Sequence, residues 1–188
     1  MRNIGKAKVL IIPIILCILG VVEFYKIQKE NVEANDYSKY YLTYKENLKE
    51  EKYSEAKESL SAANAVRSIE LYDKKLEECD KLQKSLDLYN QGTYYFNAEQ
   101  YIEAYTAFNQ VYNNDTERYA LAQEKLKQCK KLAYEKTIKD SKYEENEKSY
   151  AIAAIITHDY LYFIGNDNTI RELNEKYKSL RDGTAEKK

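Results

Sequence analysis

A short pattern of Tyr, Glu and Ala recurs along the chain at a spacing of 48 residues, and it limits the possible folds more than any other feature. Residues 52–60 read KYSEAKESL, and residues 100–108 read QYIEAYTAF. A third and weaker copy contains Tyr150, Ala153 and Thr157, another 49 residues along the chain. Recurrence at one period indicates a tandem repeat in which each copy is one supersecondary unit.

A second match supports the same period. Residues 75–82, KLEECDKL, align with residues 125–132, KLKQCKKL, with five identities in eight positions. In the first pattern, the Tyr, the Ala and the apolar residue four positions after the Ala share one helix face, and the small Ala lets a second helix approach closely. Each copy is therefore predicted to be a helical hairpin that buries its apolar stripe by stacking on its neighbours.

The scarcity of turn residues also favours helices. The chain of 188 residues has one Pro and five Gly, whereas strand-rich and α/β folds need such residues at each reversal. Hydrophobic residues make up 44% of the chain, which is enough to bury the core of about one domain. We therefore predict an all-α fold. Lysine far outnumbers arginine, a bias that we interpret as a sign of a bacterial, AT-rich genome.

Around the middle copy the sequence resembles the tetratricopeptide repeat (TPR) family. Seven positions follow the family spacing W-x2-L-G-x2-Y and then Y-x2-A-x3-F, with Leu for Trp and Gln for Leu: Leu88, Gln91, Gly92, Tyr95, Tyr101, Ala104 and Phe108. The period near 48 exceeds the family's period of about 34, so the resemblance implies lengthened helices. It implies three tandem hairpins that form a TPR-like solenoid over residues 37–183, closed by a C-terminal capping helix.

The repeat region divides into helices at its polar breaks. The predicted ranges are 36–50, 53–66, 68–96, 98–112, 116–142, 145–163 and a last helix from about 169 that Gly183 ends. Asn97 and Gln100 have the spacing of a capping box for the fourth helix, and Thr169 and Glu172 have it for the last helix. Residues 184–188 are predicted to be a disordered tail.

An unbroken apolar run, Val9 to Val22, follows basic residues near the N-terminus. These 14 residues span roughly 21 Å as a helix, and extension through residue 25 brings the length closer to the roughly 30 Å hydrocarbon layer. We predict a transmembrane signal anchor at 9–25. A cleaved signal peptide is the alternative, although the small residues that cleavage needs are incomplete.

The charges that flank this run predict its orientation. Arg2, Lys6 and Lys8 precede it, whereas the lysines that follow are mixed with glutamates. By the positive-inside rule, residues 1–8 lie in the cytoplasm. The repeat domain then follows a linker at 26–36 and lies outside the cell membrane, to which the chain is attached by a single pass.

Residues that could perform chemistry are scarce. One His and three Cys are too few for a zinc site, a disulfide framework or activation of a nucleophile by histidine. His158 precedes Asp159, but neighbouring helix residues do not face each other. Cys79 and Cys129 are interpreted as buried small residues. A net charge of −1 gives no general attraction for nucleic acid. We therefore predict a protein that is not an enzyme and has no cofactor and no metal.

The TPR resemblance implies a binding surface on the concave face, lined by the first helix of each hairpin. Carried over position by position, this surface consists of Tyr41, Lys45, Tyr89, Thr93, Phe96, Ile138 and Lys142. These side chains either hold an extended or helical peptide or pack the solenoid. The favoured function is a membrane-anchored scaffold that binds a protein or peptide partner at the outer face of the cell membrane. A self-associating assembly protein of the cell envelope and a wall-polymer binder are the alternatives.

Overall fold

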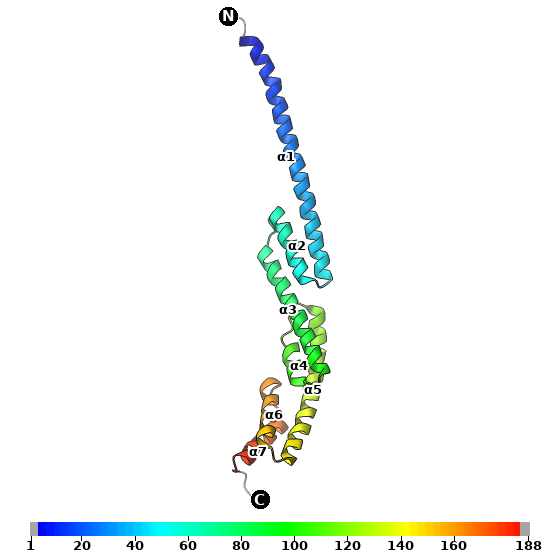
Figure 1. Cartoon of the computed structure of the whole chain (residues 1–188), viewed down its shortest axis with the longest axis vertical. Helices are drawn as coiled ribbons and strands as arrows, with labels where there is room; N and C mark the ends of the chain where they lie inside the picture. The colour runs from blue at the N-terminus through cyan, green and yellow to red at the C-terminus, as the bar shows by residue number, and fades with distance from the viewer. Residues whose placement is uncertain (1–3, 185–188) are drawn as a thin grey trace. The chain divides into compact units, whose positions relative to one another are not determined.

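The computed structural model describes the backbone of residues 4–184 and the side chains of residues 19–184. Over this part the chain forms helices and no strand, which confirms the all-α prediction. The helices (Figure 1) are α1 (Ile4–Lys49), α2 (Tyr53–Val66), α3 (Tyr72–Asn97), α4 (Tyr101–Phe108), α5 (Thr116–Asn146), α6 (Tyr150–Phe163) and α7 (Asn168–Arg181). The chain divides into two compact units within α3, residues 1–80 and residues 81–188.

Helix α1 is longer than predicted. Residues 26–36, expected to be a linker, are helical and continue into the first hairpin without a break. No Gly or Pro follows Gly20 until Gly92, so no helix-breaking residue stops α1 before the first hairpin turn. The side chains of residues 19–35 are exposed, so this stretch lies outside the core of the first hairpin.

In the part of the chain that the structure describes, no helix combines the length and the apolar character needed to cross a membrane. The side chains of residues 1–18 lie outside that part. The side chains of the predicted basic segment 1–8 and of residues 9–18 of the predicted membrane segment 9–25 therefore lie outside it, although the backbone of residues 4–18 is helical. Of the predicted tail, only Thr184 belongs to the described residues.

Three hairpin turns share one geometry. They join α1 to α2, α3 to α4 and α5 to α6, and each contains one residue with positive φ: Glu51 (61°), Glu99 (58°) and Lys148 (60°). The N–H of that residue donates to the carbonyl three residues back, and the next N–H donates to the carbonyl five residues back at 2.8 to 2.9 Å. This is the Schellman pattern of helix C-termini. The three turns are 48 and 49 residues apart, so the repeat in the sequence corresponds to a repeat of hairpins.

The Schellman turn explains why the capping box predicted at Asn97 is wrong. Asn97 ends α3, and the N-cap of α4 is Gln100, whose side chain makes no capping hydrogen bond. The N-cap of α7 is Asp167 and not Thr169, and its Oδ1 accepts a hydrogen bond from the N–H of Ile170 at 3.1 Å. Apart from the beginning of α1, the other helix ends differ from the predicted ones by up to five residues.

The core of the first unit lies between α2, the end of α1 and the beginning of α3. Ala56 and Leu60 of α2 are completely buried, and they pack with Tyr44 from α1 and Cys79 from α3. The repeated Tyr-Glu-Ala pattern thus places its apolar positions in the core, as the helix periodicity predicts.

The core of the second unit begins with α4 packed on the end of α3. Ala104 and Phe108 of α4 are completely buried with Cys129 of α5. The ring of Phe108 occupies the space beside Gly92, where an added Cβ would lie 2.7 Å from Cδ1 and Cε1 of the ring. In the first hairpin, the equivalent positions of Gly92 and Phe108 hold Tyr44 and Leu60. A large residue on one helix is therefore matched by a smaller one on the other.

Helix α7 covers the third hairpin. Its Tyr177 is completely buried, and the hydroxyl donates to Oε2 of Glu145 on α5 at 3.1 Å. The amide of Asn174 donates to the carbonyl of Ala154 at 2.7 Å and to Oγ1 of Thr157 at 2.9 Å. These bonds satisfy buried polar groups at the contact and fix α7 on α5 and α6.

Candidate functional site

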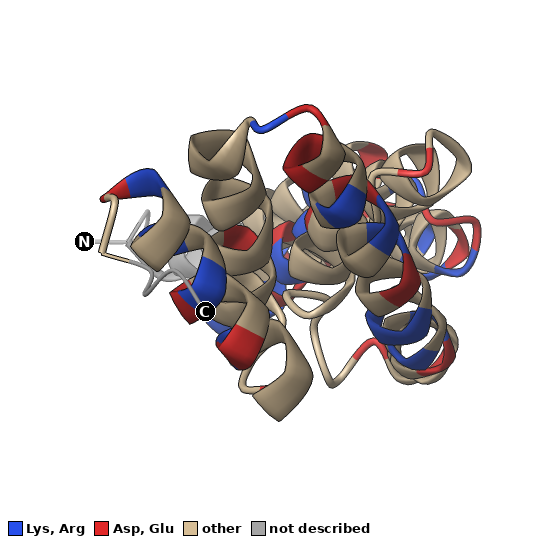
Figure 2. Ribbon diagram, turned by 90° about the horizontal axis from the view of Figure 1, so that it is seen from below, with Lys and Arg blue, Asp and Glu red and all other residues tan. Residues whose placement is uncertain are grey.

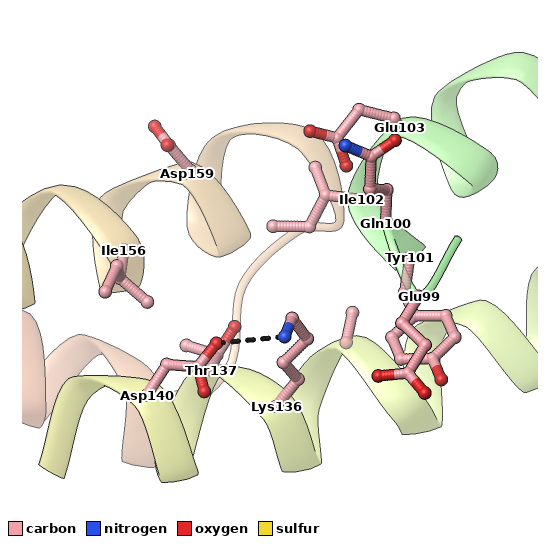
Figure 3. Close-up of a pocket in the computed structure, with 11 residues that line it drawn as sticks. Glu99, Gln100, Tyr101, Ile102, Glu103, Lys136, Thr137, Asp140, Ile156 and Asp159 are labelled. Carbon is pink, nitrogen blue, oxygen red and sulfur yellow. Dashed lines mark ion pairs between the residues drawn. The ribbon is translucent and has the colours of Figure 1, made fainter. Parts of the chain in front are cut away.

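A groove lies between the second and third hairpins, entirely within the unit of residues 81–188. It consists of two adjoining hollows of about 210 Å³ and 380 Å³, and we call it the α4–α6 groove. Ile102, Glu103 and Asp159 line both hollows and form their common wall. Figure 3 shows the smaller hollow, with residues of α4, α5 and α6 around it.

Helix α4 presents one face to the groove and the other to the core. The groove face consists of Ile102, Glu103, Thr106 and Ala107. On the opposite face, Ala104 and Phe108 are completely buried. Because the buried face fixes the rotation of the helix, the packing of Phe108 also holds Ile102 and Glu103 toward the groove.

Helices α5 and α6 line the groove with residues three and four positions apart. Lys136, Thr137 and Asp140 come from α5, and Ile156, Asp159 and Phe163 come from α6. This spacing places each set on one face of its helix. In Figure 3, Lys136 and Asp140 extend from α5 on one side, while Ile156 and Asp159 extend from α6 on the other.

The groove carries more negative than positive charge. Its charged side chains are Glu99, Glu103, Asp140, Asp159 and Lys136. The Nζ of Lys136 lies 3.3 Å from Oδ2 of Asp140, so these two charges compensate each other. Oδ1 of Asp159 lies 3.6 Å from Nδ1 of His158, which is charged only when protonated. Within the described part of the chain, Glu103 forms no ion pair. Along the helices in general, residues of both signs alternate (Figure 2).

Two of the predicted binding residues, Tyr41 and Lys45, belong to the first hairpin. The ring of Tyr41 stacks on that of Tyr37, with centroids 5.6 Å apart and planes 9° apart. The ammonium group of Lys45 lies 5.1 Å from the centroid of Tyr41, and the guanidinium of Arg67 lies 5.7 Å from that of Tyr37. These four side chains form a cation–tyrosine ladder along the hairpin, with Tyr41 partly buried against the core.

The three predicted residues of the second hairpin mainly pack the fold. The ring of Tyr89 lies against Phe108, with centroids 5.6 Å apart. The hydroxyl of Thr93 donates to the carbonyl of Tyr89 at 2.9 Å. Phe96 is partly buried in the same cluster, and the ammonium of Lys125 lies 4.2 Å from its centroid. These three side chains therefore all make contacts within the second unit.

The remaining predicted residues lie on α5. Ile138 packs against the core cluster that contains Tyr160 and Ile170, whereas Lys142 is exposed. None of the seven predicted residues is among those that line the α4–α6 groove. Sequence reasoning missed Ile102 and its neighbours. The available signal was an apolar Ile102 on the face of α4 opposite the repeated Ala, where a solvated helix would carry a polar residue.

The structure brings together few groups suited to catalysis or metal binding. Among the described residues, no cluster of three or more His, Cys, Asp or Glu is placed to hold a metal ion. His158 is exposed and stacks on Tyr162, with centroids 6.1 Å apart. Cys79 and Cys129 are free thiols, and the prediction that both are buried is confirmed. Burial raises the pKa of Cys79 and raises that of Cys129 to about 11, which makes both poor nucleophiles.

No family model, no curated protein and no solved structure matches this chain. Its function must therefore be inferred from its own residues. Among the described residues, the α4–α6 groove is the feature with the most distinct chemistry, because it combines apolar recesses with uncompensated carboxylates.

Proposed function

We propose that this chain is a membrane-anchored, TPR-like scaffold that binds a protein or peptide partner at the outer face of the cell membrane. The observation that carries the proposal is the α4–α6 groove, which offers two recesses for the side chains of a partner. Apolar residues such as Ile102, Ile156 and Phe163 in its lining supply surface that a bound partner would remove from water.

The repeated hairpins support the TPR-like part of the proposal. Ala56, Ala104 and Ala153 follow the three Schellman turns at the same distance, and all three are completely buried. A small residue at this position lets the two helices of a hairpin approach closely, which is the packing that the TPR resemblance implies. Stacking of the three hairpins into a solenoid is the arrangement that we propose.

The sequence of the N-terminal segment supports the anchor. The apolar run from Val9 to Val22 and the basic residues before it motivate a single membrane pass with the N-terminus in the cytoplasm. A Ser54→Cys variant of the full chain tests the orientation, because this exposed residue lies in the first turn of α2. A membrane-impermeant maleimide should label it in intact cells above the level of the unmodified chain. Labelling that requires lysis would contradict the orientation.

Site-specific photo-crosslinking in living cells tests the binding role. A p-benzoylphenylalanine replaces Gln91, an exposed residue that lines the larger hollow. The matched control replaces Gln128, an exposed glutamine of α5 outside both hollows. We expect one dominant adduct in the membrane fraction from position 91, absent from position 128 and lost when Ile102→Asp is added. Equal adducts from both positions, or none from position 91, would refute the binding role of the groove.

Self-association is the second candidate function, and the outer face of α6 favours it. Ile152, Ile155 and Tyr162 are 49%, 59% and 73% exposed, and exposed apolar patches often mark protein interfaces. Light scattering of the full chain in detergent, over a range of concentrations, tests this candidate. A mass that rises with concentration would favour self-association, and a constant monomer mass would exclude it.

A further inference from the structure

The wall shared by the two hollows restricts what can occupy the α4–α6 groove. This wall consists of Ile102, Glu103 and Asp159, which come from α4 and α6. Ile102 is apolar, whereas the other two side chains end in carboxylates. A ligand that fills both hollows therefore passes directly over two negative charges.

Each hollow is apolar enough to accept an apolar side chain. Ala133 and Ile156 contribute to the smaller hollow, and Tyr95, Ala107 and Phe163 contribute to the larger one. Phe163 is 46% exposed, so part of its ring would leave water when a partner binds. Removal of such apolar surface from water is the main driving force for association.

The negative charge of the wall favours a positively charged ligand. No Lys or Arg in the described part of the chain forms an ion pair with Glu103 or Asp159. Lys136 lies in the groove but is paired with Asp140. A cationic ligand therefore meets two accessible carboxylates, while a phosphate or an acidic peptide meets repulsion.

We propose that the α4–α6 groove binds a basic amphipathic segment of a partner protein, with an apolar side chain in each hollow and Lys or Arg against Glu103 and Asp159. This inference rests on the proposed scaffold function and adds the chemistry of the partner. A partner helix presents the required pattern when its apolar residues recur three and four positions apart with basic residues beside them.

A synthetic peptide serves as the probe. It is a fluorescein-labelled peptide of four helical turns, with Leu at helical spacing and Lys at the adjacent positions. The full chain in zwitterionic lipid nanodiscs is titrated into it, with empty nanodiscs as the blank, and fluorescence anisotropy reports binding. We expect saturable binding that weakens as salt is raised, because the carboxylates are solvent-accessible.

Charge-neutralising variants locate the binding. The pair Glu103→Gln and Asp159→Asn should weaken binding about tenfold and reduce its salt dependence, as expected for charges at the rim of an interface. The control pair is Glu117→Gln and Glu124→Gln, which makes the same change in net charge on exposed residues of α5 outside both hollows. It should leave binding unchanged. Circular dichroism verifies that both pairs remain folded.

Three results would overturn the inference. The first is peptide binding to the full chain that is no stronger than to empty nanodiscs. The second is equally strong binding of a peptide with Glu in place of Lys. The third is an equal loss of peptide binding in the groove pair and in the control pair of variants. The crosslink from Gln91 separates the two proposals. An adduct without peptide binding refutes the basic partner and keeps the scaffold. Peptide binding without an adduct refutes the scaffold role in cells and keeps the chemistry of the groove.

Discussion

Replacement of Gly92 by Ala tests the packing of α4 on α3 most directly. The added Cβ would lie 2.7 Å from Cδ1 and Cε1 of Phe108 and 3.0 Å from Cγ. Carbon atoms pack best at about 3.5 to 4.0 Å, so the methyl group would overlap three atoms of the ring. Phe108 is completely buried and has no solvent-filled space into which it can turn.

Two opposing effects determine how much Gly92→Ala changes the free energy of unfolding. Ala is about 1 kcal/mol more favourable than Gly inside a helix, so helix propensity alone would stabilise the variant. Overpacking of a core costs up to about 3 kcal/mol, and the contact with a fixed ring places this substitution near that limit. The difference predicts that Gly92→Ala lowers the free energy of unfolding by about 2 kcal/mol.

Urea unfolding of the full chain in detergent, followed by helical circular dichroism, measures the change. Gly20→Ala is the matched control, because a Cβ there meets nothing within 4 Å, and it should not destabilise the helix. Phe108→Leu should cost about 1 kcal/mol alone. It places at position 108 the residue type that Leu60 provides in the first hairpin.

The double variant Gly92→Ala with Phe108→Leu decides between overpacking and other causes. If the overlap with the ring is the cause, the smaller Leu relieves it, and the double variant is more stable than the sum of the single changes by about 3 kcal/mol, the full cost of the overlap. Strictly additive effects, or a Gly92→Ala variant as stable as the unmodified chain, would refute the reasoning.

Three further predictions concern buried and charged groups. Asp115→Ala removes the carboxylate that accepts a hydrogen bond from the buried guanidinium of Arg118. It should lower the free energy of unfolding, measured with urea, by about 3 kcal/mol, and a change below about 1 kcal/mol would contradict this. Cys129 is buried with a pKa of about 11, so at pH 8 it should react with N-ethylmaleimide only in urea; equal rates with and without urea would argue against its burial. The Nζ of Lys176 donates to Glu145 at 2.5 Å and lowers the pKa of that carboxyl, so the folded state binds its proton less readily than the unfolded chain. This stabilisation is present above the pKa of Glu145 in the unfolded chain, about 4.5, and is lost as the pH falls through its lower pKa in the folded state. The loss of stability in Lys176→Gln, measured by urea titrations, should therefore shrink between pH 6 and pH 3. A loss that is independent of pH would exclude the ion pair as its cause.

The repeated hairpins were predictable because their signal is local. The apolar positions of α2 and α4 recur within a few residues, so periodicity alone predicts the faces that contain Ala56 and Ala104. The turns were harder to predict. Sequence rules place a positive φ at Gly or Asn, whereas the chain uses Glu51 and Glu99 at these positions. At the second turn a capping box from Asn97 was predicted instead.

The groove depends on contacts that no local pattern contains. Ile102 and Asp159 are 57 residues apart in the sequence, and they line the same hollows only because α4 and α6 pack on α5. The predicted set from Tyr41 to Lys142 was transferred from a family with shorter repeats. In the structure, several of those side chains contact residues of their own hairpins.

The size matching within each hairpin also affects how the chain reaches its fold. Helices of near-identical pattern in one chain can pair with the wrong copy, and such mispairing is a common failure of repeat proteins. Phe108 requires the space left by Gly92, and the equivalent position in α1 holds the large Tyr44. Helix α4 therefore fits α3 and does not fit α1. The same divergence that weakens the repeat in the sequence directs each helix to its own neighbour during folding.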